Sequence, residues 1–414
     1  MRILYAGNFE WPSEQARAIQ TVHTGHALAR AGADVKLVTI RARGRQPSVP
    51  RALALYGLSP HPRFASASVP VIRVPESLRI IEIHKRLAVT NFSFCLGAAL
   101  DIARCQRHQR PDWIFTRDPR VAWTFIKLRP ITGARVVYEV HELFGTRPRD
   151  NRSLDRAEQW GVANRTRALE STVLHEADRL ITLTQACRQL IVDAHGIPES
   201  RIRMVPDGTR LPPERHGPGR LARSIFYVGQ LYRWKGVDTL IRALTDIPAA
   251  TLTIIGAGAQ EGGRDVDRAR LKHLVQDLGI AERVSFQTFV PYEQVPALLA
   301  QAAVATVPLP DVLMSRYFTS PLKIFDAMAA GTPIVASRLD SICEILTDSE
   351  NSVLVEPDSP TALAAGIRRI LDNPRLAESL ASRARLDVMA YTWDARARRI
   401  LDFLEVTNSA RLDP

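Results

Sequence analysis

The chain has few cysteines, and their spacing excludes the usual metal and disulfide frameworks. Its four cysteines show no C-x-x-C spacing and no paired histidines at zinc-finger intervals: Cys95, Cys105, Cys187 and Cys343. We therefore expect neither a disulfide framework nor a structural zinc site.

The chain also has no long apolar run. No segment reaches the eighteen or so uncharged apolar residues that a membrane-spanning helix needs. The start "MRILYAGNFEW" contains too short an apolar run for a signal peptide. We expect a cytoplasmic, non-spanning protein. Its 414 residues, 46% hydrophobic and 24% charged, are enough to bury a large core in two or three domains.

Two common nucleotide-binding motifs are missing. The sequence contains no G-x-x-x-x-G-K-[ST], and "AGNFEWPSEQ", after the first predicted strand, is not G-x-G-x-x-G. "GAGAQEGG" after Ile255 follows a later strand without the spacing that opens a helix. P-loop chemistry and dinucleotide binding are therefore disfavoured.

Acidic residues are scarce in the first half of the chain. Residues 1–212 hold 32 Lys and Arg against 19 Asp and Glu, and the remainder holds 23 against 24. Such asymmetry is typical of a half that faces something acidic, such as nucleic acid, a phospholipid surface or a polyanionic substrate. Nucleic acid is disfavoured, because no basic helix with interleaved aromatic residues accompanies the charge.

Strand and helix signals alternate throughout, which predicts parallel sheets covered by helices. The predicted strands of the first half are residues 2–6, 34–39, 70–74, 113–117, 135–140 and 179–184, with helices at 16–31 and 87–107. Those of the second half are residues 224–229, 251–258, 283–289, 304–309, 333–337 and 352–357. We expect an α/β protein with two doubly wound, Rossmann-like domains facing a cleft, at 1–212 and 213–390, and a C-terminal helix within 391–414 that packs back on the first domain.

The segment "TSPLKIFDAMAAGTPIVAS" has the features of a phosphate-binding helix start. Ser320 is a suitable N-cap, Pro321 suits the first helical position, and Gly331 ends the helical run. The N–H groups and dipole of such a start favour an anion, which Lys323 would reinforce, and Asp326 could accept hydrogen bonds from both hydroxyls of a ribose. The sequence thus indicates a nucleotide site, although an ordinary capped helix with a solvated Lys/Asp pair fits the same residues.

Two further segments supply charged residues at predicted strand ends. "GQLYRWKG" offers Arg233 and Lys235, which could neutralise a diphosphate leaving group or belong to a basic surface turn. "VVYEVHELF" places His141 at the end of a buried strand, where it could contact a sugar or fill a structural role. "FTRDPR" places Arg117 and Asp118 similarly, facing the cleft or opening a helix.

The order of "VPDGTRL", "VGQLYRWKGVDTLIRAL", "TLTIIGAG", "ERVSFQTFVPYEQVPALLAQAAVATVPL" and "SPLKIFDAMAAGTPIVASRLDSICEIL" resembles the retaining GT-B glycosyltransferases of the family 4 type. The resemblance covers nearly all of the second half and the first half loosely. It implies transfer of a sugar from a UDP-, GDP- or other nucleotide sugar to a glycan or lipid-linked acceptor, without metal.

The resemblance also implies roles for individual residues. Lys235 and a nearby arginine, here Arg233, would bind the donor diphosphate, Asp326 the ribose, and His141 the region of the donor sugar. Backbone N–H groups of Ser320, Pro321 and Leu322 are assigned to the phosphates, although Pro321 itself has no N–H. We also place Gly7, Gly229, Gly256 and Lys323 at the donor site.

Two departures from the family pattern stand out. The family often has two glutamates eight positions apart, whereas this chain has Phe318 and Asp326 there, and Gln230 stands where many relatives have an arginine. The sequence therefore does not show which residue makes the sugar contacts that the first glutamate makes in the family. A nucleotide-sugar epimerase of the same architecture and a non-catalytic nucleotide-sugar-binding subunit remain alternatives.

The basic first half also suggests where the acceptor lies. In "SLRIIEIHKRLAVTNFSFCLGAALDIARCQRHQR", basic residues such as Arg79, Lys85 and Arg86 accompany a semi-apolar helix. This predicts docking on an anionic membrane, at the inner face of the cytoplasmic membrane, unless the helix is an inward-facing core element.

Overall fold

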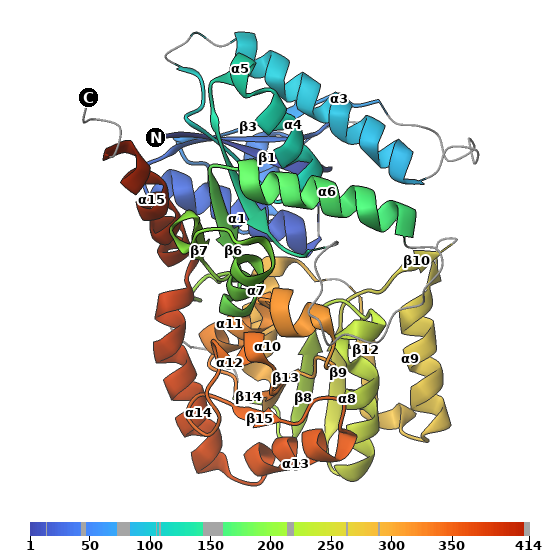
Figure 1. Ribbon diagram of the computed structural model, residues 1–414. Helices are drawn as coiled ribbons and strands as arrows, with labels where there is room; N and C mark the ends of the chain where they lie inside the picture. Colours follow the sequence, from blue (N-terminus) through green and yellow to red (C-terminus); the bar gives the residue numbers. More distant parts are fainter. Residues whose placement is uncertain are drawn as a thin grey trace. The chain divides into compact units, whose positions relative to one another are not determined.

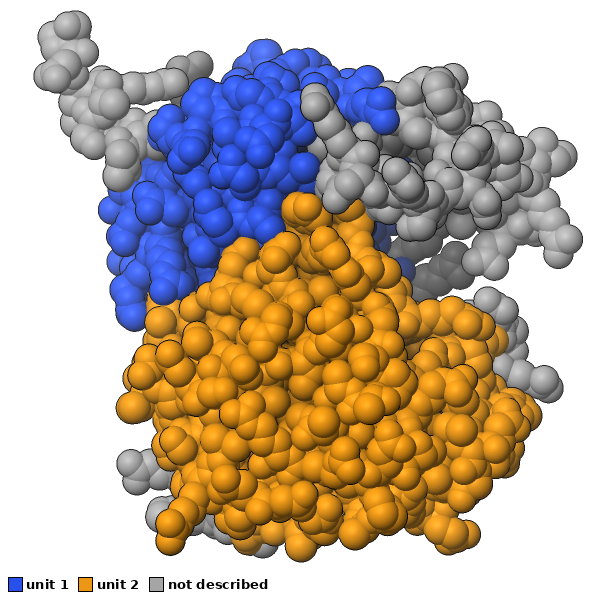
Figure 2. All heavy atoms as spheres, turned by 60° about the horizontal axis from the view of Figure 1, so that its bottom comes forward, with its two compact units in different colours: residues 1–206, 396–414 blue, residues 207–395 orange. Residues whose placement is uncertain are grey.

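The chain divides into two compact units (Figure 2), Met1–Pro206 with Arg396–Pro414 (unit 1) and Asp207–Ala395 (unit 2). The computed structural model describes residues 1–13, 15–42, 47–72, 83–104, 106, 109–143, 160–212, 219–261, 264–288 and 290–409. For residues 83–88, 160–166, 260–261, 264 and 406–409 only the backbone is described.

Unit 1 is built on a seven-stranded parallel sheet in the order β3-β2-β1-β4-β5-β6-β7. Its strands are β1 (Arg2–Glu10), β2 (Asp34–Ile40), β3 (Phe64–Val69), β4 (Trp113–Thr116), β5 (Arg135–Val140), β6 (Arg179–Thr182) and β7 (Ile202–Met204). All four residues of central β4 are buried. Such continuous burial is expected where helices cover both faces of a parallel sheet.

Helices connect these strands (Figure 1). They are α1 (Ala16–Arg30), α2 (Val49–Ala54), α3 (Ile83–Arg104), α4 (Pro119–Lys127), α5 (Arg129–Thr132), α6 (Trp160–Glu176), α7 (Gln185–His195), the 3₁₀ turn η2 (Glu199–Arg201) and most of α15 (Trp393–Ser409). α4 packs between α3 and α6. Its N-terminus is capped by Asp118, whose side chain accepts hydrogen bonds from the N–H groups of Arg120 and Val121.

Unit 2 contains a six-stranded parallel sheet in the order β12-β9-β8-β13-β14-β15. Its strands are β8 (Ser224–Val228), β9 (Thr251–Ile255), β12 (Val284–Gln287), β13 (Val304–Val307), β14 (Ile334–Ser337) and β15 (Val353–Val355), and a short hairpin pairs β10 (Gln260–Glu261) with β11 (Arg264–Asp265). One buried cluster joins β8, β9, α8 and α13, as expected for a helix-covered sheet.

The helical elements of unit 2 alternate with its strands (Figure 1). They are η3 (Arg233–Lys235), α8 (Val237–Ala243), η4 (Leu244–Asp246), α9 (Val266–Asp277), η5 (Ala281–Arg283), η6 (Tyr292–Gln294), α10 (Val295–Gln301), the π-helical turn η7 (Met314–Phe318), α11 (Leu322–Ala330), α12 (Asp340–Cys343), α13 (Pro360–Leu371), α14 (Pro374–Asp387) and η8 (Val388–Tyr391).

The strand orders make both sheets doubly wound, as predicted. The order reverses between β1 and β4 in unit 1 and between β8 and β13 in unit 2. Ligands of open parallel sheets bind beside the carboxyl ends of the strands at such a switch point. In unit 2, the loops that start at Gly229 and Pro308 meet there.

Most predicted strands are confirmed, but one prediction is wrong and one strand was not predicted. The third strand is Phe64–Val69 and not residues 70–74, of which 73 and 74 lie outside the described residues. The run "FASASV" was missed because its alternating alanines and serines carry little hydrophobic signal. The three-residue edge strand β7 was missed as well.

Candidate functional site

Two of the predicted glycines meet at the switch point of unit 2. Gly229 follows β8 at a φ of 145°, and its N–H donates to the carbonyl of Ile255, 2.9 Å away. A Cβ on Gly256 would lie 1.8 Å from the carbonyl oxygen of Gly229. The two loops approach so closely that neither position has room for a side chain, and their backbones are left open to a ligand.

Lys235 lies in the same loop, in the turn η3. The next residue, Gly236, has a φ of 72°, and a Cβ there would lie 1.6 Å from the carbonyl oxygen of Pro308. The loop after β8 is therefore packed directly on the loop after β13. The Nζ of Lys235 sits 3.5 Å from the centre of the Trp234 ring, and burial lowers the pKa of Lys235 to about 7. Arg233, at the other end of the turn, is exposed.

Lys323 reaches the same place from the first turn of α11. Its Nζ lies 3.8 Å from the centre of the Tyr227 ring and 3.0 Å from where a Cβ on Gly229 would be. The Nζ is inaccessible to solvent and has no hydrogen-bond partner in the described part of the chain. Burial, with a smaller effect of the Lys235 charge, holds the pKa of Lys323 well below its usual value. Lys235, Lys323 and Gly229 thus form one cluster.

The start of α11 differs in detail from the sequence prediction. The helix begins at Leu322 with Pro321 as its N-cap residue, and no side chain caps it. Ser320 instead accepts a hydrogen bond at its Oγ from the N–H of Asp207, 3.1 Å away. The predicted stop is confirmed, since Gly331 ends the helix in the left-handed conformation at a φ of 64°.

Asp326 lies one turn further along α11 and is 3% exposed. Its Oδ1 accepts two hydrogen bonds, from the hydroxyl of Thr209 at 2.6 Å and from that of Tyr292 at 2.9 Å. Burial raises the pKa of Asp326 to about 7, although both hydrogen bonds favour its ionised form. Because Oδ1 is already occupied, Oδ2 is the atom left to accept from a ligand.

The two departures from the family pattern also have structural counterparts. Phe318, at the position of the first glutamate, is 4% exposed at the end of the π-helical turn η7. Its ring is a core group. Gln230, at the position of the arginine, accepts a hydrogen bond at its backbone carbonyl oxygen from the hydroxyl of Tyr227, 2.6 Å away.

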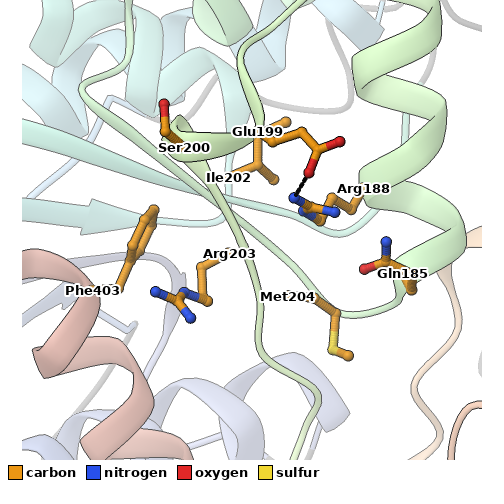
Figure 3. A pocket seen from close by; sticks show the side chains of 8 residues that line it. All are labelled: Gln185, Arg188, Glu199, Ser200, Ile202, Arg203, Met204 and Phe403. Carbon is orange, nitrogen blue, oxygen red and sulfur yellow. Dashed lines mark hydrogen bonds and ion pairs between the residues drawn. The ribbon is translucent and has the colours of Figure 1, made fainter.

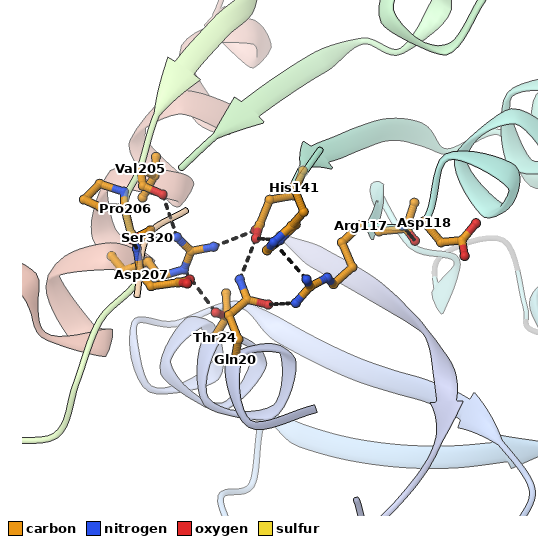
Figure 4. Close-up of polar contacts among 12 residues, drawn as sticks. Gln20, Thr24, Arg117, Asp118, His141, Val205, Pro206, Asp207 and Ser320 are labelled. Atoms are coloured by element: carbon orange, nitrogen blue, oxygen red, sulfur yellow. Dashed lines mark hydrogen bonds and ion pairs between the residues drawn. The ribbon is translucent and has the colours of Figure 1, made fainter. Parts of the chain in front are cut away.

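In unit 1, His141 directly follows β5 and belongs to a buried polar network (Figure 4). Arg117 donates to Nδ1 of His141 at 2.9 Å and to the side-chain oxygen of Gln20 at 3.1 Å. Nε2 of His141 lies 2.5 Å from Oε1 of Glu139, which also accepts from Gln20. Arg396 of α15 donates to Oε2 of Glu139 at 2.6 Å.

The donors of this network fix the state of the histidine. Because a guanidinium can only donate, Nδ1 of His141 must accept, and Nε2 carries the proton that is donated to Glu139. Burial and the charge of Arg117 lower the pKa of His141 to about 4. Burial alone would raise the pKa of Glu139, but the charge of Arg396 and the contacts of His141 bring it down to about 2. At neutral pH the histidine is uncharged and the glutamate is ionised.

The other predicted residues of unit 1 have local roles. Asp118 caps α4, so of its two predicted roles, facing the cleft or opening a helix, it has the second. Gly7 does not follow the first strand but lies inside β1, at an irregularity in the pairing with β2 between Gly7 and Glu10.

Sequence reasoning missed several groups that position these residues. Thr209 belongs to "VPDGTRL", which entered the comparison with the family but received no role. Tyr292, Gln20 and Arg396 lie far along the chain from the groups that they bind. No local pattern marks them, because their partners become neighbours only in the folded units.

Unit 1 also contains a cavity of about 420 Å³ (Figure 3). It is lined by residues from α7, η2, β7 and α15: Gln185, Arg188, Glu199, Ser200, Ile202, Arg203, Met204 and Phe403. Arg188 pairs with Glu199 at 2.5 Å, and Arg203 lies over the Phe403 ring. None of the predicted site residues lines this cavity.

Neither a metal-binding cluster nor a membrane-spanning helix is present among the described residues. In the part of the chain that the structure describes, no group of three or more His, Cys, Asp or Glu side chains is placed to hold a metal ion. Among the same described residues, no helix is both long and apolar enough to cross a membrane.

The chain matches two protein families along most of its length. Residues 18–208 match the glycosyl transferase 4-like domain, and residues 217–387 match the glycosyl transferases group 1. A D-inositol 3-phosphate glycosyltransferase of Acidothermus cellulolyticus is 30% identical over 248 residues, which are 56% of this chain and 54% of that protein. The chain thus spans about half the length of this relative.

Solved structures share the whole architecture. A sucrose-phosphate synthase from Thermosynechococcus elongatus superposes with a TM-score of 0.76 at 22% identity, covering 99% of both chains. The Anabaena protein Alr3699/HepE, solved with UDP and glucose, superposes with a TM-score of 0.72 at 15% identity, covering 98% of this chain and 100% of that one. Together with the two Rossmann-like units these matches assign the GT-B fold, and the chain belongs to the glycosyltransferases of group 1, with a family 4-like N-terminal domain.

Proposed function

We propose that this protein is a retaining glycosyltransferase that moves a sugar from a nucleoside diphosphate sugar to an acceptor hydroxyl, in the synthesis of a polysaccharide or glycolipid. The observation that carries the proposal is the cluster of Lys235 and Lys323 at the switch point of unit 2, with Asp326 one turn along the same helix. Two cations suit a diphosphate, and a carboxylate one helical turn away suits a ribose. The UDP and glucose in the Anabaena structure support a donor of this class.

The donor residues have separate tasks in this proposal. The backbones at Gly229 and Gly256 allow the diphosphate to approach, and the start of α11 at Ser320, Pro321 and Leu322 faces its phosphates with the positive end of the helix dipole. Asp326 accepts a ribose hydroxyl at Oδ2, and Lys323 contributes positive charge. Residues 213–390 form the donor domain, and residues 1–212 the acceptor domain.

Catalysis in this proposal rests on electrostatics and positioning. The bond between the anomeric carbon and the diphosphate oxygen breaks, and its electron pair leaves with the diphosphate. Lys235 and Arg233 stabilise that charge. The acceptor oxygen bonds to the anomeric carbon on the same face, and its proton passes to an oxygen of the departing phosphate. No metal ion takes part.

His141 acts as a neutral group in this scheme. With a pKa of about 4 it carries no charge at neutral pH and cannot serve as an acid there. We propose that it contacts the donor sugar as a hydrogen-bonding group, held in one tautomer by Arg117 and Glu139.

We also propose that the protein works in the cytoplasm, at the inner face of the cytoplasmic membrane, on a lipid-linked acceptor. One face of α3 supports this, because four apolar side chains at helical spacing are exposed there: Val89 (38%), Phe92 (61%), Leu96 (45%) and Leu100 (48%). The net positive charge of residues 1–212 favours anionic lipid. Arg79, and the side chains of Lys85 and Arg86, lie outside the described residues.

The first test concerns Lys235. Lys235→Ala should lower the rate of sugar transfer about a hundredfold or more, because it removes charge stabilisation of the leaving diphosphate. The rate is measured as transfer from a panel of UDP- and GDP-sugars to glycolipid and glycan acceptors. Lys272→Ala is the matched control, since Lys272 is an exposed lysine of α9. Ordinary turnover by folded Lys235→Ala protein would contradict the assignment.

Asp326 should show opposite effects on stability and on donor binding. Its pKa is raised from 3.8 to about 7, so between these values the unfolded state ionises while the native state keeps its proton. The contribution of Asp326 to the stability of the wild-type protein therefore falls as the pH rises from about 4 to 7. Asp326→Asn, which can still accept from Thr209 and Tyr292, should gain stability over the wild type across this range, by a few kcal/mol at most at pH 8. Urea unfolding at pH 5 and pH 8 measures this.

The same variant should bind donor more weakly, and Asp326→Ala should bind it more weakly still, because alanine leaves no acceptor. If both variants bind donor equally well, Asp326 does not contact the ribose. If the stability difference between Asp326→Asn and the wild type is the same at both pH values, the carboxyl does not titrate as described.

Transfer should also proceed without a divalent ion. Activity should persist after treatment with EDTA and dialysis, because positively charged side chains take the place of a metal at the diphosphate. Loss of transfer that only Mg²⁺ or Mn²⁺ restores would overturn this part of the proposal.

Flotation with vesicles tests the membrane proposal. The protein should float with vesicles rich in anionic lipid and less so at high salt, and Phe92→Ser with Leu96→Ser should weaken flotation. Leu386→Ser is the control, because Leu386 is 71% exposed but lies on α14 of unit 2. Absence of binding to anionic vesicles at low and high salt would refute docking and favour a soluble acceptor.

A further inference from the structure

Two lysine side chains point at one corner of unit 2 with no carboxylate between them. Lys235 comes from the loop after β8 and Lys323 from α11, and the charge of Lys235 acts on Lys323. The Nζ of Lys323 is buried without a hydrogen-bond partner among the described residues, and its contact is the face of the Tyr227 ring. A buried ammonium normally has an anionic or carbonyl partner. This corner is therefore incomplete without a ligand.

The acidic groups of the neighbouring elements are engaged elsewhere. Asp326 of α11 binds Thr209 and Tyr292, and Tyr227 of β8 stays uncharged because burial raises the pKa of its hydroxyl. The remaining carboxylates of these elements pair with arginines: Asp238 with Arg270, Asp265 with Arg268, Asp267 with Arg270, and Asp311 with Arg316. No described carboxylate offsets the two ammonium groups.

The sequence had suggested Arg233 as the second cation, but the structure places it differently. Arg233 is exposed, whereas the Nζ of Lys323 is buried 3.0 Å from where a Cβ on Gly229 would be. A charge in a water-poor place interacts more strongly with an anion than an exposed charge does. Lys323 is thus the better placed partner for Lys235.

We propose that Lys323 contributes more to diphosphate binding than Arg233 does, and that a nucleoside diphosphate binds at Lys235 and Lys323 with net uptake of protons. This inference rests on the proposed function, because it assumes a nucleoside diphosphate at this site. Without ligand, two adjacent buried charges repel each other and lack water, so the uncharged amines are favoured. The diphosphate reverses this balance, because its negative charge stabilises both ammonium forms.

The sign of the pH dependence follows from linkage. The pKa of Lys235 is about 7, so at pH 8 this amine is largely uncharged before binding, and the pKa of the buried Lys323 is lowered in the same direction. If both become charged on binding, affinity must fall as the pH rises above about 7. Asp326, with a pKa of about 7, is mostly ionised at pH 8, so it releases few protons when the ligand binds. The terminal phosphate of UDP or GDP, with a pKa near 6, is also ionised there.

Isothermal titration calorimetry at pH 8 with UDP and with GDP tests this directly. The binding enthalpy is measured in several buffers that differ in ionisation enthalpy, and its slope against that enthalpy gives the number of protons taken up. For the wild-type protein we expect uptake of about one proton at Lys235, with any further uptake coming from Lys323, and an affinity that weakens from pH 7 to pH 9.

Variants separate charge from packing. Lys323→Arg should take up about one proton fewer with much of the affinity retained, because arginine is always charged. Lys323→Met should lose about tenfold to a hundredfold in affinity, more than Arg233→Met, yet melt at a higher temperature, since folding no longer buries an amine without a hydrogen-bond partner. Lys272→Met, which changes an exposed lysine of α9, should match the wild type in affinity and proton count.

The outcomes distinguish this inference from the proposed function. Nucleotide binding with no proton uptake, or with the same uptake in Lys323→Arg as in the wild type, would overturn the inference and leave the function standing. A larger loss of affinity in Arg233→Met than in Lys323→Met would restore Arg233 as the second cation. If neither UDP nor GDP binds, the proposed function itself fails.

Discussion

The close packing of the loops after β8, β9 and β13, beside the switch point of unit 2, is the constraint on which the candidate site depends. Gly236 lies against the carbonyl of Pro308, and Gly256 against the carbonyl of Gly229, at separations that admit no side chain. These contacts bring the end of β8 next to the chain that leads into α11. Lys235 and Lys323, which are far apart in sequence, become neighbours for that reason. A side chain at either glycine would separate the loops and with them the two charges.

A buried charged group is paired in unit 1, whereas a buried lysine of unit 2 has no partner among the described residues. In unit 1, Glu139 is fully buried but ionised, because Arg396 and His141 bind its two oxygens. Arg396 also donates to the carbonyls of Val205 and Pro206, so its guanidinium is well satisfied. In unit 2, Lys323 has no such partner among the described residues. A satisfied buried pair holds a structure, whereas an unsatisfied buried cation is a cost that a ligand can remove.

The sequence predicted the parts of the fold that local patterns encode. Continuous apolar strands and the stop at Gly331 were read correctly, and "SPLKIFD" located Lys323 and Asp326 on one helix. Local patterns could not show β3, because its alternating alanines and serines carry little hydrophobic signal. They could not show that Thr209 and Tyr292 would occupy one oxygen of Asp326, nor that Ser320 would bind Asp207 instead of capping α11. These contacts join residues that meet only when the unit is folded.

The same distinction explains why sequence spacing favours Arg233 as the second cation, whereas we propose Lys323. Arg233 and Lys235 are neighbours in one turn, so spacing alone favours them as a pair. In the folded unit the turn η3 leaves Arg233 in solvent, while α11 carries Lys323 beneath the loop after β8. Because an exposed charge is screened by water and a buried one is not, burial matters more than closeness in sequence. In our proposal, the cost of keeping Lys323 unpaired is borne by the unliganded protein, and its relief on binding adds to the affinity for a diphosphate.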